Sequence, residues 1–144
     1  MDGLTDALRS FLDEHRVGVL ATVAVDDRPR QSVVYYVRDG DRLLISTESK
    51  RLKAQDVIRI GFASICIRGD EQPYPSATFS GPAEVVTEGI GAPTAAVMQR
   101  ITGAAEAPEP LSDAALAEVG RVVLAIAVER VGAVSYIEFA ATPS

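Results

Sequence analysis

The apolar positions at the start of the chain first recur every three to four residues and then, from Val17 onward, every second residue. The helical spacing covers Leu4, Leu8, Phe11 and Leu12. It predicts an N-terminal helix within residues 1–16, with Asp2 as the N-cap. In the segment VGVLATVAV, alternate residues of 17–25 share one face, and their β-branched side chains predict a strand.

Turn-forming residues divide the rest of the chain into further strands. Asp39-Gly40-Asp41 is a strong hairpin signal. Strands are predicted over 17–25, 30–38, 42–47, 62–68, 74–86, 121–128 and 130–139. Gly81-Pro82 predicts a bend within one of them. Short turns between these strands favour antiparallel pairing over parallel crossovers.

Two helical regions interrupt the strands. The first covers 50–60, with Ser49 as the N-cap. Its predicted buried stripe is Leu52, Ala54, Val57 and Ile58. The second is a helical insert over 88–118, which includes a short helix capped by Ser112. We therefore expect residues 1–144 to form a single, mainly β domain: a closed or nearly closed β-barrel of six to seven antiparallel strands with peripheral helices.

Composition narrows the classes of function. The formal net charge of −6 argues against a nucleic-acid partner. One cysteine, Cys66, excludes an intrachain disulfide and, with a single histidine, His15, gives no reason to expect a metal site. Cys66 lies in a buried-strand pattern, which predicts an inert core thiol. No apolar run reaches the roughly 20 residues of a membrane span. The acidic start of the sequence indicates a cytoplasmic protein.

The basic residues concentrate at one predicted junction between a strand and a helix. Ser46 and Thr47 end the strand, and Lys50, Arg51 and Lys53 occupy the helix start. Free N–H groups and the positive end of the helix dipole favour an anion there. Cations oppose that dipole, so their presence indicates binding rather than helix stability. The alternative is a solvated helix face whose cations pair locally with Glu48 or Asp56.

The preceding strand mixes polar and aromatic groups with aliphatic ones. These are Gln31, Ser32, Tyr35 and Tyr36. Such a strand can stack a flat heteroaromatic ring and donate hydrogen bonds to it. Equally, Tyr35 and Tyr36 can face opposite sides of the sheet as rim and core. No motif of a hydrolase, a nucleotide-binding loop or a zinc protease is present, so we expect no catalytic side chain and chemistry supplied by a cofactor.

Several segments, taken in order, resemble the pyridoxamine 5′-phosphate oxidase-like, FMN-binding split-barrel proteins. The likeness is closest to their branch of flavin and deazaflavin (coenzyme F420) oxidoreductases. It begins with an LAT strand, a turn before Pro29, a D-G-D hairpin and an Arg-x-Lys helix start. It continues through SATFSGPAEV and RVVLAIAVERV, and covers about residues 17–136.

The resemblance implies a homodimer with two cofactors between the subunits and hydride transfer to or from a small organic substrate. It assigns the cofactor phosphate to Arg51 and Lys53, with Ser46, Thr47 and Lys50 alongside. It places Ser32, Val33 and Val34 along the ring system. F420 is favoured over FMN. The alternatives are a non-catalytic flavin-, F420- or haem-binding protein, and a barrel whose groove is vestigial.

The sequence departs from the family pattern at two places. Asp27-Arg28 stands where the turn usually has Gly, which predicts a hairpin of different shape. Asp56 stands where Asn is usual, which predicts a negative charge near the anionic end of the cofactor.

Overall fold

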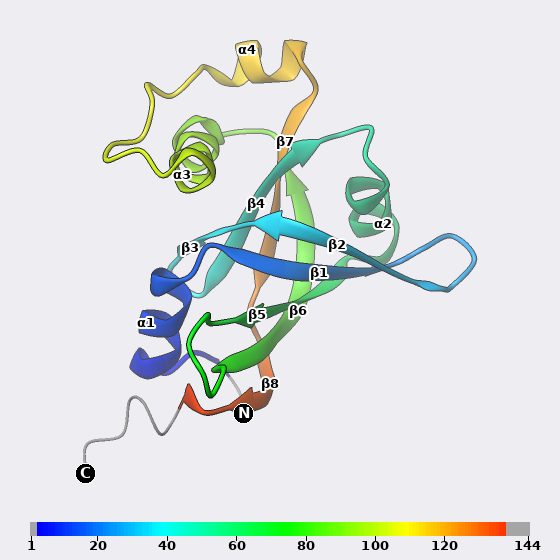
Figure 1. Ribbon diagram of the computed structural model, residues 1–144. Coiled ribbons are helices and arrows are strands. Elements are labelled where there is room, and N and C mark those ends of the chain that lie inside the picture. The colour runs from blue at the N-terminus through cyan, green and yellow to red at the C-terminus, as the bar shows by residue number, and fades with distance from the viewer. Residues whose placement is uncertain (1–2, 138–144) are drawn as a thin grey trace.

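A computed structural model describes residues 3–137 as eight strands and four helices (Figure 1). The strands are β1 (Val17–Val23), β2 (Pro29–Tyr35), β3 (Val37–Asp39), β4 (Arg42–Glu48), β5 (Phe62–Arg68), β6 (Ser76–Val86), β7 (Arg121–Ala127) and β8 (Arg130–Ser135). The helices are α1 (Asp6–Glu14), α2 (Leu52–Ile60), α3 (Gly91–Thr102) and α4 (Asp113–Glu118). In the described residues no helix is both long enough and apolar enough to span a bilayer.

The strands form one antiparallel sheet in the order β2-β1-β5-β6-β7-β4-β3, with β8 paired to β6. Residues 76–82 of β6 pair with β5, and residues 83–86 pair with β7. The partner therefore changes directly after Gly81-Pro82, where the bend was predicted. A Cβ on Gly81 would lie 1.8 Å from the carbonyl oxygen of Ala127, so only glycine fits this close approach. The curled sheet is a split β-barrel, which confirms the predicted fold class.

The predicted strand 30–38 is divided in two, which raises the strand number to eight. Its halves, β2 and β3, occupy the two ends of the sheet order, and Tyr36 lies between them. The chain itself therefore joins the two ends of the curled sheet. The backbone N–H of Tyr36 donates to the carbonyl of Arg16 at 3.1 Å rather than to a neighbouring strand. The division is a turn from one half-sheet into the other.

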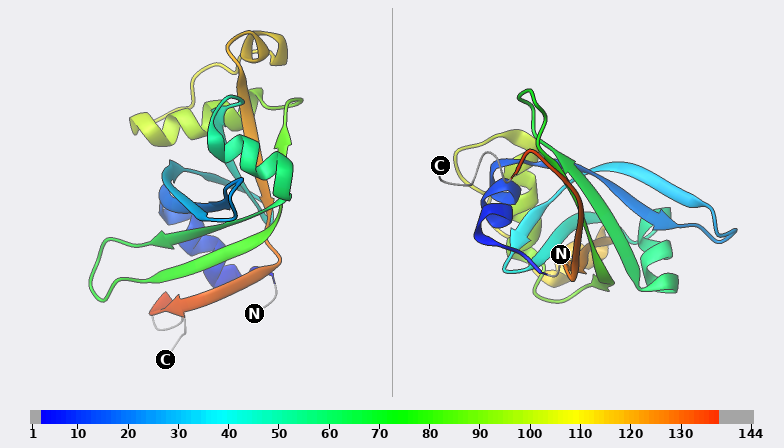
Figure 2. Two further views of the ribbon diagram at one scale, coloured as in Figure 1. Left: turned by 90° about the vertical axis from the view of Figure 1, so that its right-hand side faces the viewer. Right: turned by 90° about the horizontal axis from the view of Figure 1, so that it is seen from below.

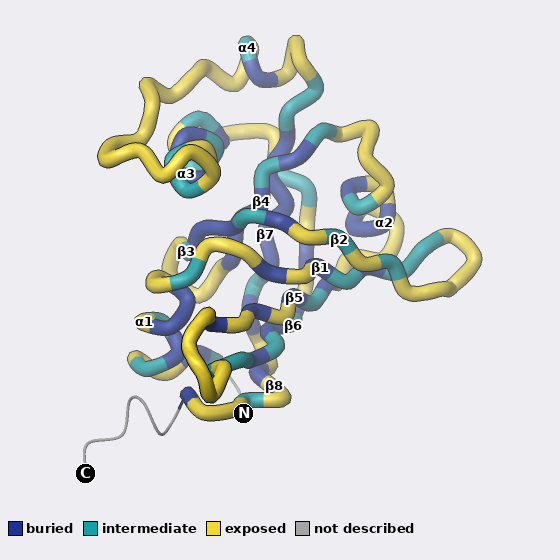
Figure 3. Tube along the Cα trace, in the orientation of Figure 1, coloured by how far each residue is buried: buried dark blue, intermediate teal, exposed yellow. Residues whose placement is uncertain are grey.

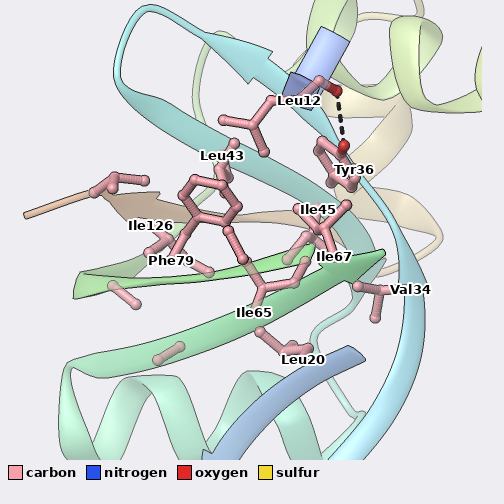
Figure 4. Packing of buried hydrophobic residues seen from close by; sticks show 14 of the residues in the cluster. Leu12, Leu20, Val34, Tyr36, Leu43, Ile45, Ile65, Ile67, Phe79 and Ile126 are labelled. Carbon is pink, nitrogen blue, oxygen red and sulfur yellow. Dashed lines mark hydrogen bonds between the residues drawn. The ribbon is translucent and has the colours of Figure 1, made fainter. Parts of the chain in front are cut away.

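The barrel interior holds the main hydrophobic core (Figure 4), and the buried side of α1 packs against it. Leu8, Phe11 and Leu12 of α1 are buried in it. The Tyr36 ring is fully buried, and its hydroxyl donates to the carbonyl oxygen of Leu12 at 2.7 Å. Tyr36 is thus a core residue and Tyr35 is half-buried outside the main core, which agrees with the core-and-rim interpretation.

A second, smaller core lies between the sheet and the helical insert. It consists of Val37, Leu44, Ile90, Val97, Leu116, Val123 and Ala125, with Tyr35 packed against it. Helix α3 contacts β2, β3 and β4, and α4 contacts β7. Ser112 caps α4 as predicted, because its hydroxyl accepts from the backbone N–H of Ala115. The insert is therefore part of the domain, although the segment joining α3 to α4 is exposed (Figure 3).

The predicted N-caps of α1 and α2 were wrong. Helix α1 is capped by Thr5, whose hydroxyl accepts from the N–H of Leu8; Asp2 lies outside the described residues. Helix α2 begins at Leu52, and its N-cap is Arg51 rather than Ser49. The backbone N–H of Ser49 instead donates to the carbonyl of Gly120 at 2.8 Å. A contact with the start of β7, far along the chain, takes Ser49 out of the helix.

The buried side of α2 also differs from the predicted stripe. Ala54 and Val57 are buried as expected, but Leu52 and Ile58 are 58% and 63% exposed. Asp56 is the third buried residue of the helix. The exposed apolar side chains lie on the outside of the domain, where the sequence period alone gave no reason to place them.

Alternation along β1 places Gly18, Leu20 and Thr22 toward the barrel interior and Val17 and Val19 on the outside. Cys66 of β5 pairs with Val19 and is exposed, so the prediction of a buried core thiol was wrong. Ile65 and Ile67 take the interior positions instead. The β1–β2 hairpin extends beyond the rest of the sheet (Figure 2). Asp27 adopts a φ of 66° at its turn, which is a left-handed conformation that aspartate tolerates better than most residues.

Candidate functional site

The split in the barrel lies between β2 and the second half of β4. One edge of β2 pairs with β1, whereas β3 pairs only with residues 42–44 of β4. Within residues 3–137, no strand pairs with the other edge of β2. Likewise, no strand in this range pairs with residues 45–48 of β4 on the edge that faces away from β7. We call this interval, between residues 29–35 and residues 45–48, the split. The backbone N–H and C=O groups along the two strand edges that border the split are available to a ligand, as on any open sheet edge.

The predicted strand residues all lie along the split, but their side chains face different ways. Ser32 and Val34 face the barrel interior, and Val34 is buried in the main core. Val33 faces outward and is 70% exposed. Ser46 is half-buried, whereas Thr47 is buried and pairs with Val122 of β7. Only the backbone of Val34 therefore remains for a ligand, and the Ser46 and Thr47 hydroxyls lie on opposite faces of β4.

The split opens at the N-terminus of α2. Arg51 is the N-cap, but no side chain accepts a hydrogen bond from the first turn of the helix. The N–H groups at a helix start need an acceptor from outside the helix. Gln55 does not supply one, because its amide nitrogen donates to the carbonyl of Ser49. A helix start without a side-chain cap, surrounded by cations, is suited to an anionic ligand.

Charged side chains gather around this helix start. Lys50 is 3.2 Å from the carboxylate of Glu48, and Arg121 of β7 approaches the same carboxylate at 4.0 Å. The hydrogen bond from Lys50 and the charges of Lys50, Arg51 and Arg121 lower the pKa of Glu48. Partial burial, with a smaller contribution from the charge of Arg51, lowers the pKa of Lys53. Four cations and one carboxylate thus form what we call the cation cluster: Glu48, Lys50, Arg51, Lys53 and Arg121.

Sequence reasoning missed Arg121 as part of this cluster. It lies about 70 positions after Arg51, and only the antiparallel pairing of β4 with β7 brings it opposite Glu48. The pairing of Lys50 with Glu48, in contrast, is the local contact that the solvated-face alternative predicted. Lys53 differs from the other predicted cations, because its ammonium is partly withdrawn from water.

Asp56 does not lie free beside the cation cluster, as its place in the sequence predicted. It is 1% exposed and accepts hydrogen bonds from Thr22 at 2.8 Å and from Arg30 at 2.7 Å. Arg59 donates to its other oxygen at 3.3 Å. Burial raises the pKa of Asp56, but the hydrogen bonds from Arg30 and Thr22 and the charge of Arg30 outweigh it, so the net pKa is lowered. The extra negative charge is therefore neutralised within the protein.

These features give a strip of open backbone with a cationic end. Such an arrangement can bind an extended molecule that has a flat hydrogen-bonding part and an anionic tail. Residues 4–135 match the family described as "Pyridoxamine 5'-phosphate oxidase". The chain belongs to that family. The match covers the barrel, the insert and the whole cation cluster.

Solved structures with this fold include proteins of different recorded function. A conserved hypothetical protein from Mycobacterium tuberculosis, Rv2991, is 25% identical with a TM-score of 0.70, over 90% of this chain and 84% of that one. An F420 reductase is 22% identical with a TM-score of 0.72, and the match covers 90% of this chain and 98% of that one. HutZ, the heme storage protein from Vibrio cholerae, is 18% identical with a TM-score of 0.65, and the match covers 92% of this chain and 95% of that one. A search of curated proteins gave no match.

Membership of the pyridoxamine 5'-phosphate oxidase family accounts for the split barrel and its antiparallel order. The family includes oxidoreductases, and structures of this fold also include heme-binding proteins. Which ligand a protein of this fold binds therefore depends on the side chains of the individual protein.

Proposed function

We propose that the protein is an oxidoreductase that binds F420 or FMN, with the anionic tail of the cofactor at the cation cluster and its ring system along the split. The observation that carries this proposal is the helix start of α2, which has no side-chain cap and lies at the open end of the split among Lys50, Arg51 and Lys53. The likeness to an F420 reductase structure supports the choice of cofactor class.

Arg51 and Lys53 would hold the cofactor phosphate, with Lys50 and the Ser46 and Thr47 segment beside them. Lys50 shares its charge with Glu48 and Arg121 shares the same carboxylate, so Arg51 and Lys53 are the more available cations. Lys53 supports this assignment, because a bound anion would stabilise its charged form and so offset the lowering of its pKa by partial burial.

Ser32, Val33 and the backbone of Val34 would lie against the ring system. Val33 offers an exposed apolar surface, and the unpaired edge of β2 offers backbone donors and acceptors. A cofactor of this class held by these residues would supply hydride transfer, which is the chemistry that it brings to a protein. The chain's own contribution is to bind the tail, orient the ring and leave one ring face open to a small organic substrate.

We further propose that the protein is a homodimer with its cofactor sites between the subunits. The outward row Val33, Val19 and Cys66 follows the strand register across β2, β1 and β5. Val17 and Val19 are 38% and 37% exposed in the protomer. A continuous row of apolar side chains on an open sheet face marks an interaction surface.

The cofactor proposal is tested by titrating the purified protein with F420 and with FMN, followed by absorbance and fluorescence. The double variant R51A/K53A should lose a contact set worth several kcal/mol, roughly 100-fold or more in affinity. R28A is the control, because Arg28 is an exposed arginine in the β1–β2 turn. Equal affinity of wild type and R51A/K53A for both cofactors would refute the site.

The dimer proposal is tested by light scattering on V19D, with V25D as the control. Val25 is 80% exposed at the hairpin turn, outside the outward row. A charge at Val19 should convert the dimer to a monomer, whereas V25D should remain dimeric. A monomeric wild type would exclude the arrangement.

A non-catalytic haem-binding protein is the second candidate, favoured by the structural likeness to HutZ. The only histidine of the chain, His15, packs against the Phe11 ring with centroids 4.7 Å apart and lies outside the split. Haem binding here would therefore use another axial ligand or His15 at a different surface. A Soret band that appears on hemin addition and is lost in H15A would favour this candidate over the flavin-type one.

A further inference from the structure

Asp56 is a buried carboxylate that no contact with the cation cluster explains. It lies one helical turn after Lys53, on the side of α2 that packs on the barrel. Three side chains from three elements donate to it: Thr22 of β1, Arg30 of β2 and Arg59 of α2. A buried carboxylate is retained only when its oxygens are paired in this way.

The geometry of these donors fixes α2 to one rung of the sheet. Thr22 and Arg30 are direct partners in the β1–β2 ladder, and both donate to the same oxygen, Oδ2. Arg59 completes the connection, because it also donates to the carbonyl oxygen of Val23. Rotation or sliding of α2 would break the bonds to both strands at once and leave the carboxylate buried without partners.

The same rung lies beside the split. Arg30 and Ser32 face the same side of β2, two residues apart. On α2, residues three apart share one face, so Lys53 lies on the face of Asp56. Asp56 holds α2 against Arg30. Because Lys53 shares the helix face of Asp56 and Ser32 shares the strand face of Arg30, Lys53 is directed toward the side of β2 that carries Ser32. Arg30 and Arg59 are occupied by Asp56, which leaves Arg51 and Lys53 for an external anion.

We propose that Asp56 is a positioning residue: through Thr22, Arg30 and Arg59 it holds α2 in the orientation that brings Lys53 to the split. This inference rests on the proposed function, because it assigns Asp56 to the placement of a cofactor-binding cation. Asp56 touches no ligand in this scheme. Its effect on binding passes through Lys53.

The experiment compares D56A and D56N, each with and without K53A, in titrations with F420 and with FMN. D56A should weaken the binding of the cofactor roughly tenfold, which is about 1.4 kcal/mol and lies within the range of couplings in a contacting network. D56N should bind almost as wild type, because the Asn amide oxygen still accepts from Thr22 and Arg30. In the K53A background, D56A should change the affinity less than twofold.

D13A is the matched control. Asp13 also pairs with an arginine, Arg38, at 2.7 Å, but this pair joins α1 to β3 away from α2. D13A should leave the affinity unchanged. An affinity of D56A equal to wild type would overturn the inference, and so would an equal loss in the presence and absence of Lys53. If D56A does not fold, T22V removes one donor and should show a smaller loss with the same dependence on Lys53.

Hydrogen–deuterium exchange separates this inference from the cofactor proposal. In D56A the amides of residues 52–60 should exchange faster than in wild type, whereas D13A should leave them unchanged. Wild type that binds neither cofactor would refute the proposed function, and the exchange rates would still decide whether Asp56 holds α2. Unchanged exchange in D56A would overturn the positioning role.

Discussion

Replacing Tyr36 with phenylalanine tests the packing at the junction of the two half-sheets. The ring is fully buried, and phenylalanine preserves its shape. The change removes one hydrogen bond, from the hydroxyl to the carbonyl oxygen of Leu12 at 2.7 Å (Figure 4). Leu12 is also fully buried, so its carbonyl loses a donor that water does not replace. We expect Y36F to lower the free energy of unfolding by about 1–3 kcal/mol at pH 7.

The same variant should change the response to alkali. Burial raises the pKa of Tyr36; the charge of Arg100 lowers it and that of Asp13 raises it, and the net pKa is well above the ordinary value. The folded protein therefore keeps the phenol neutral, whereas the unfolded chain ionises it above about pH 10. The stability gained from Tyr36 is complete below that pH and is lost as the pH rises above it.

Urea unfolding of wild type, Y36F and Y35F at pH 7, 9 and 10.5 measures both effects. Tyr35 is the matched control, because it is the adjacent tyrosine and its hydroxyl donates no hydrogen bond to residues 3–137 of the structure. Y35F should unfold within about 0.5 kcal/mol of wild type. The difference between wild type and Y36F should narrow from pH 9 to pH 10.5. Equal stability of Y36F and wild type at pH 7, or a difference independent of pH, would refute this account.

Three further predictions concern Lys53, Asp56 and Gly81. Because the pKa of Lys53 is lowered, the affinity for the cofactor should decline with rising pH before the pH reaches the ordinary lysine pKa of about 10.4. Cofactor titrations at several pH values should show that K53R removes this decline. An identical decline in K53R would contradict the prediction. Because the pKa of Asp56 is also lowered, its contribution is present above about pH 4 and is lost as the pH falls through the folded-state pKa. D56N should therefore be about 1–3 kcal/mol less stable than wild type at pH 7, with a difference that shrinks toward pH 2.5 in urea unfolding; a constant difference would count against the prediction. G81A should lower the free energy of unfolding by roughly 1–3 kcal/mol or more, because the added Cβ would lie 1.8 Å from the carbonyl oxygen of Ala127. Thermal unfolding compares G81A with the control G132A, because a Cβ at Gly132 would have nothing within 4 Å.

The strand pattern of this chain could be predicted from the sequence, but the side that each strand buries could not. The alternation in 17–23 is correct, yet the valines lie outside and Gly18, Leu20 and Thr22 lie inside. A face of valines indicates burial of some kind. It does not distinguish the interior of a barrel from a surface that another subunit covers. Cys66 was misplaced for the same reason, because both faces of β5 carry apolar residues.

The candidate site was predicted where its residues are neighbours in sequence and missed where they are not. Ser46 to Lys53 form one continuous segment, so their common location followed from the order of the residues. Arg121 joins them only through the β4–β7 register. The partners of Asp56 come from β1 and β2, 34 and 26 positions away. Local spacing carries no information on such contacts, which depend on how the sheet curls.

The covalent junction at Tyr36 gives the split a direction. Since β2 and β3 are successive parts of one chain, the two half-sheets meet at that residue and diverge away from it (Figure 1). The unpaired edges of β2 and of residues 45–48 in β4 therefore have one end in common, at the buried Tyr36, and from the other end of residues 45–48 the chain continues to α2. The backbone itself thus closes this interval at one end and leaves the two edges unconnected at the other, so the two ends of the split are not equivalent.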